Sequence, residues 1–266
     1  MPALPLDEIR ERARALWDVW TRQPENFAKA LRVTWEKLGF QGHKPGQGRI
    51  PDATPAYHVA EGILHILTQT WLSLAQQEPE HLDAFLGELW NHPVLESRKA
   101  AILLWAKQPH TTPHDLERFW NWYEQTRHDP TLQKALLEHI APRLARERTK
   151  GYQQTLFRRI QGASPQTLPR LLPLLFPLLH TPNFDDFPTL RQHLTPHLSP
   201  PAKESLPEWV PILRALFRRW PGETMPWLRR MAHTHPSETW SWMFRRLYPW
   251  LEEPWKSRLR ELSRTL

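Results

Sequence analysis

The residues best suited to chemistry in this 266-residue chain are the arginines and tryptophans that alternate near its C-terminal end. Seven of the 15 tryptophans fall between positions 209 and 255. Arginine offers a planar fork of donors that fits phosphate, and an exposed indole ring provides a face on which a base can stack. We therefore predict that this region binds nucleic acid. The predicted contacts are Arg218, Arg219, Trp227, Arg229, Arg230, Trp242, Arg245 and Arg246.

Two of the arginine pairs belong to a short internal repeat. Residues 221–228 align with 236–243 as P-x-E-T-x-x-W, and an Arg-Arg pair follows each tryptophan within three residues. Helix capping explains much of this match, because proline and glutamate suit a first helical turn and arginine suits the later turns. If the two helices stack in parallel, the pairs would form one basic ridge. The alternative is that the tryptophans are core wedges and the arginines are solvated or stacked on them.

A second candidate site is the aromatic segment 118–124, which reads RFWNWYE. Phe119, Trp120, Trp122 and Tyr123 should not all fit into a core from one helix, so we expect at least one ring to be exposed or to line a groove. Trp120 and Trp122 therefore join the predicted nucleic-acid contacts. An aromatic ring beside a carboxylate would suit a cationic base or sugar, whereas the alternative is an oversized packing patch. The carboxylates close in sequence are Asp115, Glu117, Glu124 and Asp129.

Other familiar sites are weak or absent in the sequence. His58, Glu61 and His65 fall at i, i+3 and i+7 of an expected helix, but a single helix rarely supplies a complete metal site. Histidines at a helix interface are the default interpretation. The chain has no cysteine, which excludes disulfides, thiolate zinc sites and a cysteine nucleophile. It also lacks a GxxxxGK[S/T] phosphate loop, a complete dinucleotide motif and a G-x-S-x-G elbow. We expect no metal and no cofactor.

Proline sets the position of the elements that must carry these residues. At the first helical position, proline loses only an N–H that would be unpaired anyway, and its fixed φ suits a helix. Such starts recur about every 17 residues, and a helix pair of about 35 residues is the size of an α-solenoid repeat. Strand patterns are nearly absent. We predict an all-α fold, an α-solenoid of about seven antiparallel helix pairs of the HEAT-like type. The prolines in question are Pro24, Pro79, Pro93, Pro113, Pro130, Pro165, Pro221 and Pro236.

Apolar spacing then predicts individual helices and a domain plan. Prolines at every fourth position from 165 to 177 predict a kinked or broken apolar helix that is buried. We expect one domain, 1–266, with a helical cap at 1–39, a Gly/Pro-rich loop at 40–55 and helical repeats over 56–266. The expected helices are 6–20, one from Pro24, 56–77, 79–90, 93–107, 113–126, 130–146, 149–161, 221–232, 236–248 and 254–265.

Charge is distributed unevenly along the chain, whose net charge is +7. Residues 1–133 hold 14 basic and 17 acidic side chains, whereas residues 134–266 hold 21 and 11. This excess indicates an anionic partner for the basic C-terminal half. Of the 35 basic residues 26 are arginine, and a GC-rich genome is an alternative cause of that preference. The sequence shows no signal peptide and no apolar run that could span a bilayer. We therefore expect a cytoplasmic monomer that does not contact membranes.

Three segments, 37–40 (KLGF), 88–90 (ELW) and 96–104 (ESRKAAILL), give the chain a resemblance to a known family. Together with the basic C-terminus, they are similar to the HEAT-like repeat proteins of the bacterial alkylpurine DNA glycosylase type, over about a third of the chain. The resemblance implies binding of duplex DNA and, if the activity is kept, excision of alkylated bases. The adjacent tryptophans and closely following aspartate of that family are absent. The nearest segment is 120–124, where Glu124 would be the catalytic carboxylate.

A different class of function also fits the predicted architecture. Solenoids present long surfaces to other proteins, and a fold does not determine a function. The alternative hypothesis is therefore a non-enzymatic scaffold for protein–protein interaction. Salt-sensitive affinity for nucleic acid would distinguish the two.

Overall fold

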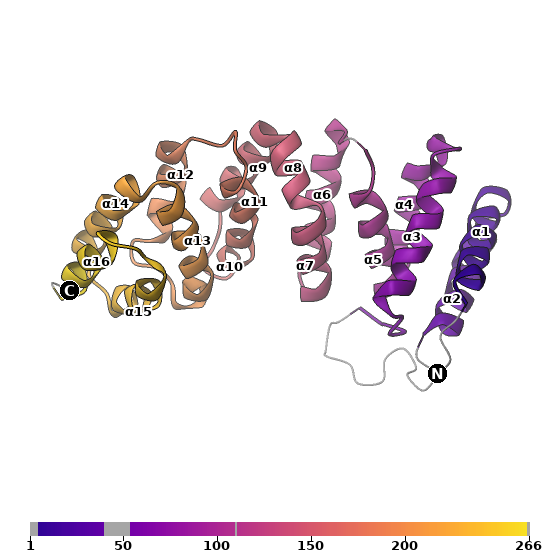
Figure 1. Ribbon diagram of the computed structural model, residues 1–266, viewed down its shortest axis with the longest axis horizontal. Coiled ribbons are helices and arrows are strands. Elements are labelled where there is room, and N and C mark those ends of the chain that lie inside the picture. The colour runs from indigo at the N-terminus through magenta and orange to yellow at the C-terminus, as the bar shows by residue number, and fades with distance from the viewer. Residues whose placement is uncertain (1–4, 40–53, 110, 265–266) are drawn as a thin grey trace. The chain divides into compact units, whose positions relative to one another are not determined.

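The computed structural model describes residues 5–39, 54–109 and 111–264 (Figure 1). Among these residues every regular element is a helix, and the β-type pairing is limited to an isolated bridge between Leu198 and Pro201. The all-α prediction is confirmed for this part of the chain. By its contacts the chain forms two compact units, Met1–Ile140 (unit 1) and Ala141–Leu266 (unit 2). The predicted loop 40–55 lies outside the described residues, except for its last two positions.

Unit 1 is a set of packed helices in which alternate helices are neighbours. The odd-numbered helices α1, α3, α5 and α7 contact one another in succession, while α2, α4 and α6 pack on α1, α5 and α7 (Figure 1). Of the two helices predicted as an N-terminal cap, α1 thus packs directly on α3, and α2 packs on α1. The helices of unit 1 are α1 (Leu6–Arg22), α2 (Pro24–Leu38), α3 (Glu61–Ala75), α4 (Leu82–Asn91), α5 (Leu95–Ala106), α6 (Pro113–Gln125) and α7 (Pro130–His139).

Tryptophan side chains join these helices through both packing and hydrogen bonds. Trp35 and Trp71 are fully buried. The Nε1–H of Trp71 donates to the carbonyl oxygen of Ala13 at 2.9 Å, which ties α3 to α1. The Nε1–H of Trp35 donates to Ser97 Oγ at 2.7 Å, which ties α2 to α5. A buried indole that satisfies its only donor in this way contributes its large apolar surface without a desolvation cost.

The segment 54–60, which leads into α3, is held by the start of α5. Glu96 Oε1 accepts hydrogen bonds from the backbone N–H groups of Tyr57 at 2.9 Å and Val59 at 3.4 Å. These bonds keep the two N–H groups out of a helix, so the predicted helix start at 56 is wrong and α3 begins at Glu61. His58 has a φ of 59°. It therefore lies outside the helix that carries His65, and the expected three-residue helical face does not form.

Unit 2 contains shorter helices and several 3-10 turns. The proline-rich stretch is broken as predicted, into α10, a 3-10 turn (η2, Leu172–Leu174) and α11, and most of its leucines are buried. Near the C-terminus, α13 packs on α14 and α15, and α16 packs on the same two helices. The helices of unit 2 are α8 (Ala141–Glu147), α9 (Thr149–Gln161), α10 (Leu168–Leu171), α11 (Leu175–Leu179), α12 (Phe187–Leu194), α13 (Leu206–Arg219), α14 (Pro221–Thr234), α15 (Glu238–Leu247) and α16 (Trp255–Arg264).

The proline prediction holds at five of the eight positions. Pro24, Pro113, Pro130 and Pro221 each begin an α-helix, and Pro79 begins a 3-10 turn. Pro93, Pro165 and Pro236 instead lie before their helices. At the last of these, Ser237 provides the cap, because its side chain accepts a hydrogen bond from Thr239 N–H.

The expected helix 130–146 is wrong, because the chain breaks at Ile140. Helix α7 ends at His139 and α8 begins at Ala141. Pro142 explains the break, since it has no N–H to donate and its ring would crowd the carbonyl of Glu138 in a continuous helix. The boundary between the two units falls at the same place.

Candidate nucleic-acid interface

Three of the seven tryptophans of the C-terminal region are part of the core. Trp209 and Trp240 are fully buried and Trp227 is 4% exposed, with its Nε1–H bound to Thr195 Oγ1 at 3.1 Å. Trp242 is half-buried under the guanidinium of Arg246, which lies 4.2 Å from the ring centroid. Trp250 differs, since it is 56% exposed in the 3-10 turn η5 (Tyr248–Trp250). The predicted contact Trp227 thus presents no free ring face.

Trp250 is a stacking surface that was not among the predicted contacts. The guanidinium of Arg214, on α13, lies 3.7 Å from its ring centroid. A tryptophan that is exposed in spite of its apolar area, and is already paired with a cation, suits stacking against a further planar group. Sequence spacing could not distinguish Trp250, because six other tryptophans lie in the same region and have similar types of residue beside them.

The predicted arginines fall into two groups. Arg219 is held inside the unit, where it donates to the carbonyl oxygens of Leu179 at 2.7 Å, Thr181 at 2.9 Å and Pro182 at 3.2 Å, and also to that of Phe184. Its guanidinium therefore stabilises the fold of unit 2 by satisfying these backbone carbonyls. By contrast, the other predicted arginines are all exposed: Arg218, Arg229, Arg230, Arg245 and Arg246.

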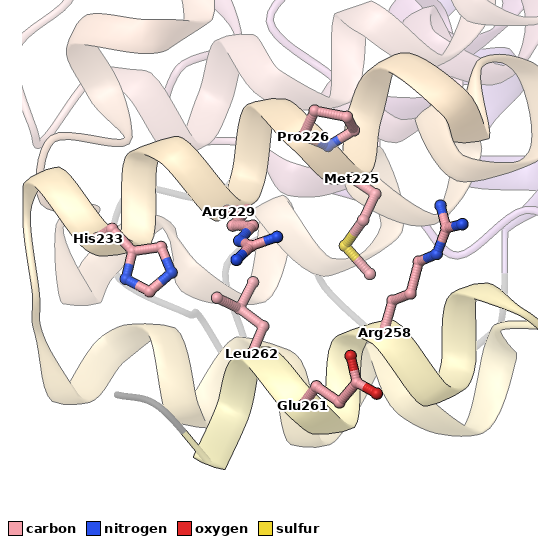
Figure 2. A pocket seen from close by; sticks show the side chains of 7 residues that line it. All are labelled: Met225, Pro226, Arg229, His233, Arg258, Glu261 and Leu262. Atoms are coloured by element: carbon pink, nitrogen blue, oxygen red, sulfur yellow. The ribbon is translucent and has the colours of Figure 1, made fainter.

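One arginine of the α14 pair lines a groove between α14 and α16, with a volume of about 440 Å³ (Figure 2). Figure 2 shows Arg229 and His233 on α14 above Arg258 and Glu261 on α16. This α14–α16 groove is thus mixed in charge, because one carboxylate accompanies its two arginines. The remaining lining residues are Met225, Pro226 and Leu262.

One arginine of the α15 pair lines a separate groove of about 300 Å³ between α15 and α16. The two grooves share no lining residue and use different sides of α16, so the arginine pairs do not face one common groove. The α15–α16 groove contains three arginines and no carboxylate. Two of them, Arg260 and Arg264, were not predicted, although their i, i+4 spacing indicates a shared helical face. Its lining residues are Phe244, Arg245, Tyr248, Leu259, Arg260, Ser263 and Arg264.

The expectation of an exposed ring in the aromatic segment of α6 is wrong. Phe119 and Tyr123 are at most 1% exposed, Trp120 is 4% exposed and Trp122 is 7% exposed. Trp122 stacks on Trp90 of α4 with centroids 4.0 Å apart and planes within 1°. A helix with neighbours on more than one side can bury more than one face, which is why rings at adjacent positions all fit. Neither predicted tryptophan contact presents a ring to solvent.

Two of the four carboxylates near this segment, Asp115 and Asp129, are helix caps. Asp115 is buried and accepts from the backbone N–H of Thr112 at 2.6 Å and from Trp105 Nε1–H at 2.9 Å. Asp129 is 7% exposed and caps α7 by accepting from Leu132 N–H at 3.0 Å. Glu124, the candidate catalytic residue, is exposed on α6. It lines neither of the two grooves that hold the predicted arginines.

A serine and a histidine of unit 1 have the geometry of a nucleophile and its base, yet they are structural. Ser97 Oγ lies 3.0 Å from His92 Nδ1, and the same oxygen accepts from Trp35. Burial lowers the pKa of His92, and the nearby charges of Arg32 and Arg98 lower it further. Ser97 is fully buried, so no substrate could reach its hydroxyl. This network connects α2 to the start of α5.

Neither a metal cluster nor a membrane-spanning helix occurs among the described residues. No group of three or more histidine, aspartate or glutamate side chains within residues 5–39, 54–109 and 111–264 could hold a metal ion. No helix in these ranges is both long enough and apolar enough to cross a membrane.

Comparison with known proteins adds no family to this description. The chain matches no family model, no curated protein and no solved structure. The resemblance to alkylpurine DNA glycosylases therefore remains a prediction from the sequence.

Proposed function

We propose that this protein binds nucleic acid through α14, α15 and α16 of unit 2. The observation that supports this most strongly is a group of seven exposed arginines on these three helices, none of which has an ion pair with a described carboxylate. Their positive charge is left for a partner from outside, and a polyanion supplies matching charge along a surface. The seven are Arg229, Arg230, Arg245, Arg246, Arg258, Arg260 and Arg264.

The charge of the whole unit supports the same proposal. Residues 141–266 hold 20 basic and 10 acidic side chains, whereas residues 1–140 hold 15 and 18. The boundary between the compact units is thus also a boundary in charge. Binding would be concentrated in unit 2, where the long-range field favours an anion.

Exposed Trp250 supports nucleic acid over a simpler polyanion, because it offers a ring on which a base can stack. Apolar exposure elsewhere is slight. Among the described residues the large apolar side chains that are exposed are Leu6, Val33 and Trp250, the first two of them in unit 1. Within residues 5–39, 54–109 and 111–264, exposed large apolar side chains are thus too few to favour the protein-scaffold alternative.

The architecture that we propose for each unit is a stack of helix pairs of the HEAT-like type. The succession of contacts from α1 through α3 and α5 to α7 supports it, since repeat proteins are built from such nearest-neighbour contacts. Base excision is not part of the proposal. Glu124 belongs to α6 of unit 1, whereas the arginines that carry the binding function belong to unit 2.

The test is binding to duplex DNA, single-stranded DNA and RNA over a series of salt concentrations. Replacement of Arg229, Arg230, Arg245 and Arg246 by glutamate should weaken binding at least about 100-fold, because four phosphate contacts become repulsive. A matched control makes the same change in charge on exposed positions of α1 and α2 in unit 1 that form no ion pair with a described carboxylate. The control positions are Arg14, Arg22, Lys29 and Lys37.

The control variant should retain most of the wild-type affinity. If the two variants lose affinity equally, the loss is an effect of net charge alone, and α14–α16 is not the interface. A wild-type protein with no salt-dependent affinity for any of the three nucleic acids would refute the proposal itself.

A further inference from the structure

We propose that the α15–α16 groove is a discrete binding site for one phosphate group. The inference rests on the proposed function, because it names the group that this part of the basic surface would hold. The phosphate could come from the backbone of a nucleic acid or from a terminal or free phosphate. The chemistry that recognises it is the same in these cases.

Three arginines converge on this groove from two helices. Arg245 comes from α15, whereas Arg260 and Arg264 lie one turn apart on α16 and so project on the same side. The hydroxyl-bearing residues Tyr248 and Ser263 also line the groove. Its volume of about 300 Å³ lies at the lower end of the range of about 300 to 1,000 Å³ that is typical of ligand pockets.

Two of the three guanidinium groups are already oriented by the protein. Arg260 donates a hydrogen bond to the hydroxyl of Tyr248 and lies 5.1 Å from the centroid of that ring. Arg245 donates from Nε to the carbonyl oxygen of Ser241 at 3.2 Å. Each guanidinium has five N–H donors, so each keeps donors for a ligand after these contacts. Orientation before binding reduces the entropy that a ligand must overcome.

Beneath the arginines the groove has an apolar floor. Phe244 is 1% exposed and Leu259 is 1% exposed, and both line the groove. A floor of this kind keeps water away from one side of a bound anion, which strengthens charge-assisted hydrogen bonds from the arginines. A phosphate monoester presents three unesterified oxygens and nearly two negative charges, and a backbone diester presents two such oxygens and one charge. Either group accepts hydrogen bonds from several converging guanidinium groups.

The α14–α16 groove contains a carboxylate, and the α15–α16 groove does not. On the other side of α16, Glu261 accompanies Arg229 and Arg258, so a negative charge is built into that groove (Figure 2). The α15–α16 groove has no lining carboxylate, and its three arginines form no ion pair with a described carboxylate. Three like charges around a small groove repel one another until an anion binds between them.

The first experiment compares the melting temperature of the full chain in inorganic phosphate and in chloride at equal ionic strength. Phosphate at about ten times its dissociation constant should raise the melting temperature by about 2 to 4 °C. The double variant Arg245→Gln, Arg260→Gln should lose this response. The single variant Arg245→Lys should lose part of it, because lysine keeps the charge but not the planar fork.

The neighbouring groove provides a matched control, Arg229→Gln with Arg258→Gln. It removes the same two charges and also one cation–π pair, since Arg258 lies 4.8 Å from the centroid of Trp255. This control should keep the full response to phosphate. Any loss of response that arises from net charge, or from a lost cation–π contact, would appear in both double variants.

A second measurement distinguishes the sources of the phosphate. Single-stranded oligonucleotides of one sequence are compared with a 5′-phosphate and with a 5′-hydroxyl. A terminal phosphate site predicts an affinity at least about tenfold higher for the phosphorylated strand, because a monoester carries more charge than a diester. A backbone site predicts equal affinities for the two strands. In either case the Arg245, Arg260 double variant weakens binding and the Arg229, Arg258 control does so less.

The outcomes that contradict the site are separate from those that contradict nucleic-acid binding. No rise in melting temperature with phosphate, or equal loss of the rise in both double variants, overturns the discrete site. The proposed function survives that result if the wild-type protein still binds nucleic acid in a salt-dependent way. A response to phosphate without any affinity for nucleic acid supports the site and refutes the proposed function.

Discussion

At the scale of single residues, neighbouring arginines in this chain have different tasks. Arg218 is exposed at the end of α13, whereas Arg219 donates to four carbonyl groups at the end of α11 and in the turn after it. Carbonyls at a helix C-terminus lack partners within the helix and carry partial negative charge, so a guanidinium is a suitable cap for them. A residue type that suits phosphate is equally suited to backbone oxygen.

This difference predicts unequal effects on stability. Arg219→Gln should lower the free energy of unfolding by about 2 to 3 kcal/mol, because several charge-assisted hydrogen bonds are lost together. Arg218→Gln should change it by less than about 0.5 kcal/mol, as is usual for an exposed side chain. Urea unfolding of the two variants measures the difference. Equal midpoints would mean that the four carbonyls are satisfied equally well without the arginine.

At the scale of elements, the end of α2 and the segment 54–60 depend on a residue without a side chain. A Cβ at Gly39 would lie 2.5 Å from the carbonyl oxygen of Tyr57 and 2.9 Å from that of Trp35. Both obstacles are backbone atoms, so neither can rotate away. The same segment is held by Glu96, which accepts hydrogen bonds from the backbone N–H groups of Tyr57 and Val59.

Two glycine substitutions should therefore have opposite signs. Gly39→Ala should cost at least about 2 kcal/mol of stability, because the backbone must shift to accept the new atom. Gly87→Ala, in the interior of α4 where no atom lies within 4 Å of the new Cβ, should stabilise by about 0.5 to 1 kcal/mol. The free energies of unfolding in urea provide the comparison. A stabilising Gly39→Ala would show that the segment can move without cost.

At the scale of the whole molecule, two compact units with opposite net charges make up one chain. Unit 1 has its own aromatic core around Trp35 and Trp71, and unit 2 has its own around Trp209 and Trp240. Separate cores are the property that lets parts of a chain fold alone. The charge imbalance then assigns nucleic-acid binding to one of them.

We expect residues 1–140 and residues 141–266 to fold when each is produced separately. Only 141–266 should bind nucleic acid with strong salt dependence, since it holds the net positive charge and the seven exposed arginines that form no ion pair with a described carboxylate. Circular dichroism tests the folding and a salt series tests the binding. Binding by residues 1–140, or by neither part when the full chain binds, would contradict this division of function.

The sequence by itself determined the helical class, most helix positions and the uneven charge. These are local or additive properties: apolar spacing marks a helix, proline restricts its start, and charges can be counted without coordinates. Even the break of the segment from 165 to 177 was predictable, because prolines at every fourth residue exclude a continuous helix. The break at Ile140 follows from the same property of proline, here Pro142. It was not predicted, because the apolar spacing of 130–146 is that of one continuous helix.

Only the tertiary structure decided which side chains remain available to a ligand. Burial depends on neighbours that are distant in sequence: Trp90 covers Trp122, and the carbonyls after α11 occupy Arg219. The packing of α16 against α14 and α15 likewise places Arg229 and Arg245, one from each arginine pair, in different grooves and brings Arg260 and Arg264 to Arg245. Residue type states what an arginine or a tryptophan can bind. Its neighbours in space determine whether that capacity is used inside the fold or left for a partner.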